Sequence, residues 1–372
     1  AVNYMEKNHA EARNYSRNPN GEAEKTGNLV TAIFTHDTSR ALDPNLHGHA
    51  ISMNLTQAPD GSWKALWNQE IWKNNTTIGQ VYHAVLRNPV EKLGYSVEAA
   101  GKHGTFEIKG VPKDVRTEFS TRTTQINAEI EKWNATDPRD QKKITLYTRD
   151  PKIKLENRDT LTDSWRERLD GYSFDAAALR DAAVAKAELA QKSPIVEKAS
   201  AVIAEMKARF SSVGSHDKLV TTGPRALFLS SQEIRAQHAT ASAIRHLSER
   251  EAAFSKSAVL AAALNLQVRG VDPGHVIERI DQLVRQGHLI PGKSERIDGH
   301  VDLVTTPQSL RMETAVLERI QAASDQGRIY HDPQIASQRL QEATTALGIE
   351  RAGKPDWKLN EGQLAAGIAI LA

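Results

Sequence analysis

The 372-residue sequence contains no cysteine, so disulfide bonds and thiolate metal sites are excluded. It has no run of 18 apolar residues and no signal peptide, and we therefore expect a cytoplasmic protein without a membrane partner. Aromatic residues make up only 5% of the chain, and 48 basic against 46 acidic residues leave a net charge of +2. So small an excess does not by itself indicate nucleic-acid binding, and any DNA affinity must come from local patches.

Three of the 13 histidines lie close together in the sequence, at His36, His47 and His49. Residues two apart on a β-strand point to the same face, so His47 and His49 would share one. The ten residues between His36 and His47 allow a strand to end, turn at residues 43–45 and return beside itself. Three imidazoles could then converge on one divalent ion and leave a coordination position open.

The flanking residues favour strands on both sides of this turn. Residues 29–35 are mostly apolar and β-branched, which predicts a buried strand leading into His36. Residues 47–56 alternate between two faces, with the histidines continuing the apolar one. A turn at residues 59–61 then leads into residues 63–66, which predicts an antiparallel meander.

A histidine on a strand is more often a surface or hydrogen-bonded residue than a metal ligand, but the grouping of three favours a metal. We expect a divalent ion such as Mg, Mn or Zn, whose identity stays open because imidazoles suit several metals comparably. A hydrolase using metal-bound hydroxide would also need a carboxylate base. Asp37 and Asp43 are the nearest carboxylates, and no paired spacing singles out either.

Several strings around the histidines resemble one known family. TGNL (26–29), HDTSR (36–40) and DPNLHGHA (43–50) resemble the three-histidine motif of conjugative relaxases of the TrwC/TraI type. The match continues in the family's order and covers about residues 26–130, through these strings: KLGY (92–95), GKHG (101–104) and GVP (110–112).

The resemblance implies an HUH relaxase-like α+β fold, in which an antiparallel sheet with flanking helices cuts one strand of plasmid DNA at a transfer origin. It also implies that His36, His47 and His49 are the metal ligands. The family usually has threonine where this chain has Gly48, which keeps the ligand spacing but loosens the strand.

The reaction implied by the resemblance is transesterification by a tyrosine hydroxyl, which leaves a 5′-phosphotyrosyl strand and a free 3′-OH. Family members carry the nucleophilic tyrosines well upstream of the histidines, whereas Tyr4 and Tyr15 alone precede His36 here. We interpret both as aromatic residues of a helix face. We therefore expect no catalytic nucleophile in this chain, and a missing N-terminal segment that supplies it becomes one expected partner.

Single-stranded DNA at a transfer origin is the main expected partner, beside a relaxosome accessory or coupling protein. Arg40 is the candidate for a phosphate contact near the histidines, with an ion pair to Asp37 or Asp43 as the alternative. A basic run offers another patch, for which a solvated face is the ordinary interpretation; it comprises Lys142, Lys143, Arg149, Lys152 and Lys154.

Residues 76–93 have a helical apolar pattern that predicts a helix broken near Pro89. The polar residues His83 and Arg87 of this helix could face a DNA cleft, although solvent exposure is the ordinary alternative. Other expected elements are a hairpin at 97–100 and 105–108, a helix at 113–133 and a helix at 159–169 with Trp165 inward.

The sequence predicts three parts: a partial relaxase domain (1–172), a helical connector (173–237) and a mostly helical region (238–372). In the last part, helices at 256–266 and 273–286 precede strands at 288–291 and 300–304. This spacing indicates a winged-helix-like unit. Such units bind DNA or partner domains, and the sequence does not choose between them.

The C-terminal residues resemble the lead-in to the helicase part of relaxase-helicases, through LSER (247–250) and LNEGQ (359–363). By that resemblance Gln363 would read adenine. No phosphate-binding loop pattern follows Gln363 before Ala372, so we expect ATP to serve a parent helicase and not this chain. The preferred hypothesis is a fragment of a conjugative relaxase-helicase, and the alternative is a non-catalytic DNA- or protein-docking module of the conjugation machinery.

Overall fold

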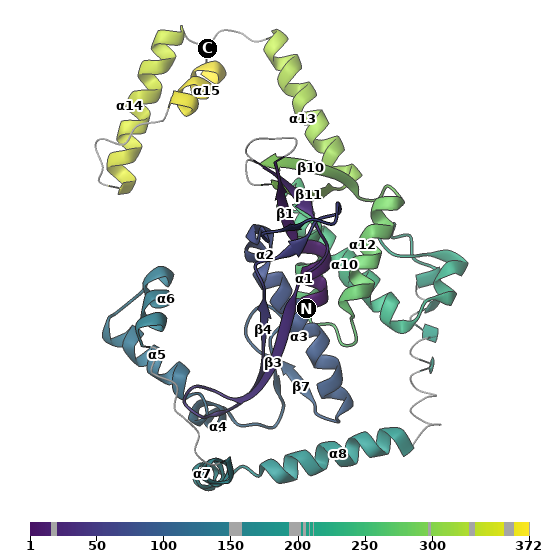
Figure 1. Cartoon of the computed structure of the whole chain (residues 1–372). Helices are drawn as coiled ribbons and strands as arrows, with labels where there is room; N and C mark the ends of the chain where they lie inside the picture. Colours follow the sequence, from purple (N-terminus) through teal and green to yellow (C-terminus); the bar gives the residue numbers. More distant parts are fainter. Residues whose placement is uncertain are drawn as a thin grey trace. The chain divides into compact units, whose positions relative to one another are not determined.

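The computed structural model describes residues 1–15, 21–148, 158–192, 202–203, 206–207, 209–210, 212–296, 299–326, 332–352 and 361–371. These residues form two compact units, Ala1–Pro307 and Gln308–Ala372, each of which is considered by itself (Figure 1). The predicted division into 1–172, 173–237 and 238–372 stays a prediction.

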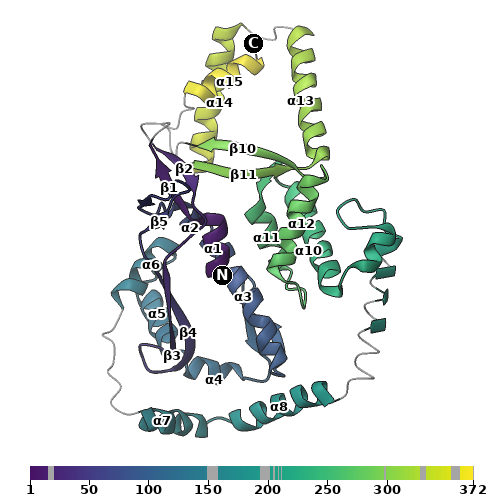
Figure 2. The ribbon, with the colours of Figure 1, turned by 45° about the vertical axis from the view of Figure 1, so that its right-hand side comes forward.

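The N-terminal part of the first unit combines short helices with antiparallel strand pairs (Figure 2). The pairs are β1 (Glu11–Asn14) with β2 (Glu22–Lys25), β3 (Thr31–Thr38) with β4 (Pro44–Ser52), β5 (Thr56–Gln57) with β6 (Trp63–Lys64), and β7 (Val97–Ala99) with β8 (Phe106–Ile108). The helices are α1 (Val2–His9), α2 (Gln69–Lys73), α3 (Asn75–Lys92), α4 (Lys113–Glu118), α5 (Thr121–Lys132), α6 (Pro138–Tyr147), α7 (Arg158–Asp170) and α8 (Ala176–Lys192). The α+β class is confirmed, but the expected meander is replaced by separate strand pairs in the residues described.

The hairpin of β3 and β4 carries the three histidines, as the alternation predicts. Its turn lies slightly earlier than expected, because Ser39 donates its backbone N–H to the carbonyl of Asp43 at 2.9 Å and β4 already begins at Pro44. The prediction of a buried β3 is wrong for the described residues, in which Ile33 is 65% and Phe34 51% exposed. In those residues β3 and β4 pair only with each other, so both faces of the ribbon meet solvent.

Two helix boundaries differ from expectation. Helix α3 continues through Pro89 to Lys92, and the predicted break is wrong. A proline this close to the helix end removes only one backbone donor, and its carbonyl still accepts from the N–H of Leu93 at 3.0 Å. The helix expected over 113–133 is divided into α4 and α5 near Ser120.

The C-terminal part of the first unit contains the predicted winged-helix-like arrangement. Its elements are η1 (Gly223–Phe228), α10 (Ser231–Ser248), β9 (Ala253–Ser255), α11 (Lys256–Asn265), α12 (Pro273–Arg285), β10 (Ile290–Arg296) and β11 (Gly299–Thr305). The strand order β10-β11-β9 adds a third strand that the sequence pattern did not predict. Ser230 and Glu233 form a reciprocal capping box at the start of α10.

The main hydrophobic core of the first unit lies among α10, α11 and α12, with Phe254, Leu260 and Leu283 fully buried. Val81 of α3 joins the same core. Gln80 of α3 also donates its amide to the carbonyl of Ala261 on α11 at 3.4 Å. The winged-helix-like unit is therefore docked onto α3 through α11.

The second unit is helical in the residues described. It contains most of α13 (Pro307–Gln326), together with α14 (Pro333–Ala352) and α15 (Glu361–Leu371). Helices α14 and α15 pack closely at Gly367, where an added methyl group would lie 2.9 Å from a methyl carbon of Leu340. None of the helices in the described part of either unit combines the length and apolar character needed to cross a bilayer.

Candidate metal centre

The antiparallel register of β3 and β4 brings the three predicted histidines together. His36 lies directly opposite His47, and His49 follows on the same face of β4. The ring centroids are 5.6 Å apart for His36 and His47, 4.8 Å for His36 and His49, and 4.9 Å for His47 and His49. The hairpin therefore holds three imidazoles in one cluster.

The hydrogen bonds of His47 define which of its nitrogens is available to a metal. Its Nδ1 lies 2.8 Å from the carbonyl oxygen of Asn45, and because a carbonyl oxygen only accepts, Nδ1 must carry the proton. Nε2 of a neutral His47 then carries the lone pair, which faces Nε2 of His49. A backbone carbonyl that fixes the tautomer in this way is the usual outer partner of a metal-binding histidine.

The spacing of two donor nitrogens fits a metal ion, but the three imidazole rings are not oriented to bind one together. Nε2 of His47 lies 3.2 Å from Nε2 of His49, and two nitrogens bound to one tetrahedral zinc lie roughly 3.3 Å apart. As the side chains stand, no group of three or more His, Asp or Glu residues in the described part of the chain is arranged to hold a metal ion. Metal binding thus requires a further rotation of the rings within the cluster.

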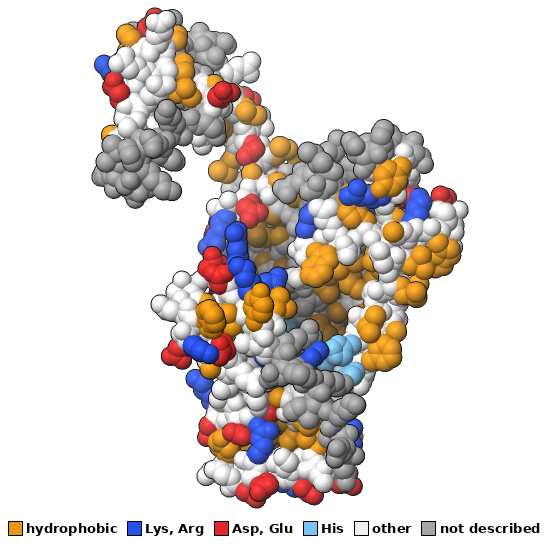
Figure 3. All heavy atoms as spheres, turned by 60° about the vertical axis from the view of Figure 1, so that its left-hand side comes forward, with side chains coloured by type: hydrophobic (Ala, Val, Ile, Leu, Met, Phe, Trp, Pro, Cys, Tyr) orange, Lys and Arg blue, Asp and Glu red, His pale blue; other side chains and the backbone are white. Residues whose placement is uncertain are grey.

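The cluster is accessible from solvent. His36 and His47 are half-buried and His49 is exposed. Hydrophobic side chains of the same hairpin are also exposed, among them Leu46 at 77% and Ile51 at 59%. Imidazole and hydrophobic side chains are seen next to each other on the surface shown in Figure 3.

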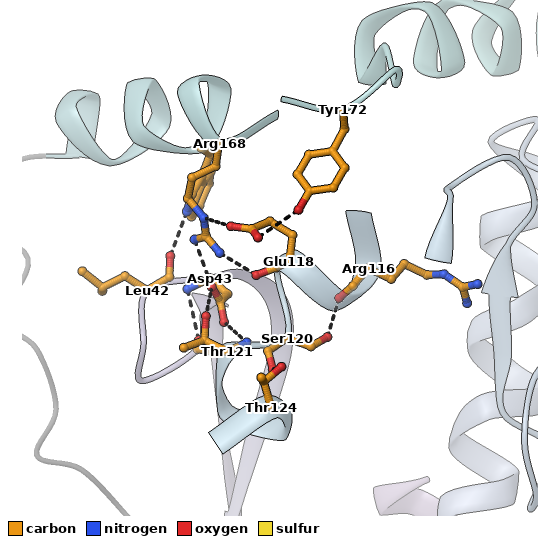
Figure 4. Close-up of polar contacts among 11 residues, drawn as sticks. Leu42, Asp43, Arg116, Glu118, Ser120, Thr121, Thr124, Arg168 and Tyr172 are labelled. Atoms are coloured by element: carbon orange, nitrogen blue, oxygen red, sulfur yellow. Dashed lines mark hydrogen bonds and ion pairs between the residues drawn. The ribbon is translucent and has the colours of Figure 1, made fainter. Parts of the chain in front are cut away.

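A polar network anchors the turn between the two histidine strands (Figure 4). The buried Asp43 accepts from the backbone N–H and the hydroxyl of Thr121, both at 3.0 Å, at the start of α5. Arg168 of α7 donates to Asp43 at 3.1 Å and to the Glu118 carboxylate at 2.9 Å. The hydroxyl of Tyr172 donates to the other oxygen of Glu118 at 3.0 Å.

Two further contacts hold the same turn. Trp165, predicted to point inward, donates its indole N–H to the carbonyl of Leu42 at 2.8 Å. Leu42 has a φ of +62°, a conformation that a leucine adopts only when the surroundings impose it. The hydrogen bonds from Arg168 and Tyr172 also hold the pKa of Glu118 below its ordinary value. Sequence reasoning missed this anchoring role of Asp43.

These contacts bear on the hydrolase alternative, which needs a carboxylate base. Asp43 is 2% exposed and occupied by Thr121 and Arg168. Asp37 forms an ion pair with Arg158. Both carboxylates are therefore engaged in structural contacts, and neither is a ready base.

The three predicted DNA contacts occupy different surroundings. Arg40 lies exposed at the turn beside the histidine strands, where it also has an intrachain partner. Arg87 donates from Nη1 to the carbonyl of Gln267 at 3.0 Å, and its Nε lies 3.3 Å from Glu91. His83 is half-buried on the same side of α3, and burial lowers its pKa. DNA contact by these residues stays a prediction.

The remaining sequence candidates are placed as follows. Tyr4 of α1 packs against the core of the winged-helix-like unit, where burial raises its pKa despite a hydrogen bond with Ser257. Tyr15 directly follows β1, so the helix-face interpretation is wrong for this residue. Lys143 pairs with Asp140 at 2.9 Å. Three members of the predicted basic run lie outside the described residues: Arg149, Lys152 and Lys154.

A phosphate-loop pattern is present elsewhere in the sequence, upstream of Gln363. Residues 287–294 read GHLIPGKS, which matches G-x-x-x-x-G-K-[ST]. A working phosphate loop follows a strand and opens a helix whose N–H groups face the phosphates. Here Gly287 follows the end of α12, and Lys293 and Ser294 lie within β10, so the structural context is the reverse.

The segment that contains the histidine cluster is similar to one known protein family. Residues 1–172 match the model of the TrwC relaxase family, which confirms the resemblance inferred from the sequence strings.

Curated relatives extend the similarity beyond that segment. The chain is 30% identical over 356 residues to the multifunctional conjugation protein TraI of Escherichia coli, and 30% identical over 362 residues to TraI of Escherichia coli strain K12. In each case the alignment covers 92% of this chain and 18% of the relative. The chain thus spans less than a fifth of the length of these proteins.

Among solved structures, the conjugative relaxase TrwC in complex with oriT DNA is similar in its metal-free form, with a TM-score of 0.43 and 32% identity over 47% of this chain and 62% of that one. The metal-bound form of that complex has a TM-score of 0.43 and 32% identity over 47% and 60% of the two chains. TrwC with a 27-mer DNA comprising the recognition hairpin and the cleavage site has a TM-score of 0.43 and 31% identity over 47% and 62%.

Proposed function

We propose that this chain is a segment of a conjugative DNA relaxase and that His36, His47 and His49 bind one divalent metal ion in it. The single observation that carries the metal proposal is the 3.2 Å separation of the His47 and His49 Nε2 atoms, beside the ring of His36. The match of residues 1–172 to the TrwC relaxase family supports the relaxase assignment.

The chemistry of the site would be electrostatic. His36, His47 and His49 would hold a divalent ion, whose positive charge would polarise the scissile phosphate and stabilise developing negative charge. The carbonyl of Asn45 keeps the Nδ1 proton of His47 and so leaves Nε2 as the donor to the ion. The contacts of Asp43 hold the turn that joins the two histidine strands.

The parent reaction would be strand-specific nicking of plasmid DNA at a transfer origin. A tyrosine hydroxyl, supplied by a segment outside this chain, would attack the phosphate and leave a 5′-phosphotyrosyl strand and a free 3′-OH. The exposed apolar ribbon, with Ile33 and Leu46 at its surface, would accommodate further structure of the parent. ATP would serve the parent helicase, and accessory or coupling proteins would join through other surfaces.

Calorimetric titration with manganese or zinc tests the metal proposal. We expect one binding event per chain, which is lost when the cluster is replaced by His36→Ala, His47→Ala and His49→Ala. A matched control replaces three exposed histidines of the other part of the unit: His216→Ala, His238→Ala and His246→Ala. Equal metal binding by both triple variants would refute the site.

A separate assay tests the reaction. We expect the chain to bind a single-stranded transfer-origin oligonucleotide without forming a covalent adduct. A phosphotyrosyl adduct trapped on this chain, mapped by mass spectrometry to Tyr4 or Tyr15, would overturn the assignment of the nucleophile to another segment.

The alternative function, a non-catalytic docking module, is favoured by one observation. Helix α11 of the winged-helix-like unit contacts α3 and does so partly through the carbonyl of Ala261. This contact is within one chain, and it shows that the unit packs against another structural element. Retained partner binding in a chain without metal or DNA affinity would favour that alternative.

A further inference from the structure

A groove beside β1 brings aromatic and basic side chains together away from the histidine strands. It has a volume of about 590 Å³ and is open to solvent. Its lining includes Arg13, Tyr15, Lys64, Ala65 and Trp67. None of these residues takes part in the candidate metal centre.

Backbone pairing explains why these side chains share one face. Ala12 of β1 pairs with Leu66 in an antiparallel bridge, and the N–H of Trp67 donates to the carbonyl of Glu11 at 2.7 Å. The period of two then places Arg13 opposite Ala65 on the outer face, while Ala12 points inward and is fully buried. Both Arg13 and Ala65 line the groove.

Arg13 stacks on Trp67 within the groove, and the ring of Tyr15 lies close to Gly21. The guanidinium carbon of Arg13 lies 4.2 Å from the ring centroid of Trp67. A methyl group added at Gly21 would lie 3.0 Å from Cε1 of Tyr15 and 3.3 Å from Cβ of Arg13, so the tyrosine ring lies directly over this glycine. Tyr15 nevertheless keeps 59% of its surface exposed.

The two basic side chains of the groove, Lys64 and Arg13, differ in how available their charges are to a ligand. Lys64 lies 3.6 Å from Glu24 and 4.0 Å from Asp60, which offset much of its charge. Arg13 is exposed and presents its guanidinium plane on the face of an aromatic ring. A planar cation near the exposed ring of Tyr15 matches a nucleobase and its phosphate, because bases stack on π-faces and arginine adds a cation–π contact.

We propose that this groove binds one base of a single DNA strand, stacked on Tyr15, with Arg13 at the adjoining phosphate. The proposal rests on the proposed function, which supplies single-stranded DNA as the ligand, and adds a second contact point away from the histidines. Tyr15 is a stacking residue in this assignment and not a nucleophile. Gly21 has a φ of +77° and no side chain, and it leaves room for the tyrosine ring.

Fluorescence anisotropy with a labelled oligothymidylate, in the presence of a chelator, tests the groove without a metal contribution. We expect Tyr15→Ala to weaken binding about ten-fold and Tyr15→Phe, which keeps the ring, to restore most of it. Trp72→Ala is the matched control, because Trp72 is 68% exposed on α2 and does not line the groove. This variant should bind the oligonucleotide with the affinity of the unsubstituted chain.

The salt dependence separates stacking from charge. Arg13→Ala should reduce the slope of log affinity against log salt by about the contribution of one phosphate, whereas Tyr15→Ala should leave the slope unchanged. Equal affinities for the parent, Tyr15→Ala and Arg13→Ala would refute the groove while leaving DNA binding intact. No oligonucleotide binding by the parent chain would instead refute the proposed function on which the groove depends.

Discussion

The guanidinium of Arg168 lies 3.1 Å from the carboxylate of Asp43, although 125 residues separate them in the chain. Asp43 belongs to the turn of the histidine hairpin, and Arg168 to α7 near the end of the segment that matches the relaxase family model. Arg168 also stacks on Phe119, with its guanidinium carbon 4.4 Å from the ring centroid. The ion pair therefore ties the candidate metal centre to helices that form much later in the sequence.

This ion pair gives the first prediction. Asp43→Asn should lower the free energy of unfolding by about 2–3 kcal/mol, because it removes the charge that faces Arg168 in a buried site. Urea unfolding followed by circular dichroism measures the loss. Asp163→Asn is the control, since Asp163 pairs with Arg166 on an exposed helix face and should change stability by less than about 0.5 kcal/mol. Equal losses in the two variants would contradict the anchoring role.

Gly48 gives the second prediction. It lies in β4 opposite Thr35, and no atom lies within 4 Å of the position that a Cβ would take. Gly48→Thr should raise the free energy of unfolding by about 0.5–1 kcal/mol, because a β-branched residue favours the strand and adds a cross-strand pair with Thr35. Metal binding should be unchanged.

The control for that substitution is Gly27→Thr. Gly27 also has open space around its Cβ position, but its φ of +67° strains any β-branched residue. We expect this variant to be less stable than the parent in the same thermal or urea unfolding experiment. Stabilisation by both threonines would show that backbone conformation does not govern the effect.

His9 gives the third prediction, which concerns pH. Burial lowers its pKa from 6.5 to about 4 although Glu70 lies nearby. The pKa of His9 is lower in the folded chain than in the unfolded chain. At a pH between the two pKa values, the unfolded chain therefore binds a proton at His9 and the folded chain does not. The contribution of His9 to stability should therefore fall by about 2 kcal/mol as the pH is lowered from 7 to 5.

Urea midpoints at the two pH values measure this dependence. His9→Gln should remove that part of the loss, and His216→Gln, at an exposed histidine, should keep the parent's behaviour. A His9→Gln variant that loses as much stability on acidification as the parent would argue against the buried, neutral imidazole.

The sequence predicted local structure well where one pattern determined it. Alternation placed the histidines on one strand face, and the hairpin then followed from the short connection to His36. The helices of the winged-helix-like unit followed from their apolar periodicity. These features depend on neighbours in the chain, which the sequence displays directly.

Long-range pairings could not be read in the same way. Nothing near Asp43 in the sequence indicates Arg168 or Thr121 as its partners. The exposure of Ile33 and Phe34 was equally hidden, because an apolar strand predicts burial only when another element covers it. The GHLIPGKS string shows the opposite case: it matches the phosphate-loop pattern, but its Lys293 and Ser294 lie in a strand and do not begin a helix that could bind phosphate.

Arg87 has a wider consequence for the first unit. Its guanidinium donates to the carbonyl of Gln267, in the segment that follows α11. A DNA phosphate that bound Arg87 would have to compete with that carbonyl. DNA binding at α3 and docking of the winged-helix-like unit would therefore both use the side chain of Arg87. The two equilibria would then be linked reciprocally: whatever tightens the docking weakens DNA binding at this point by the same factor, and DNA loosens the docking in return.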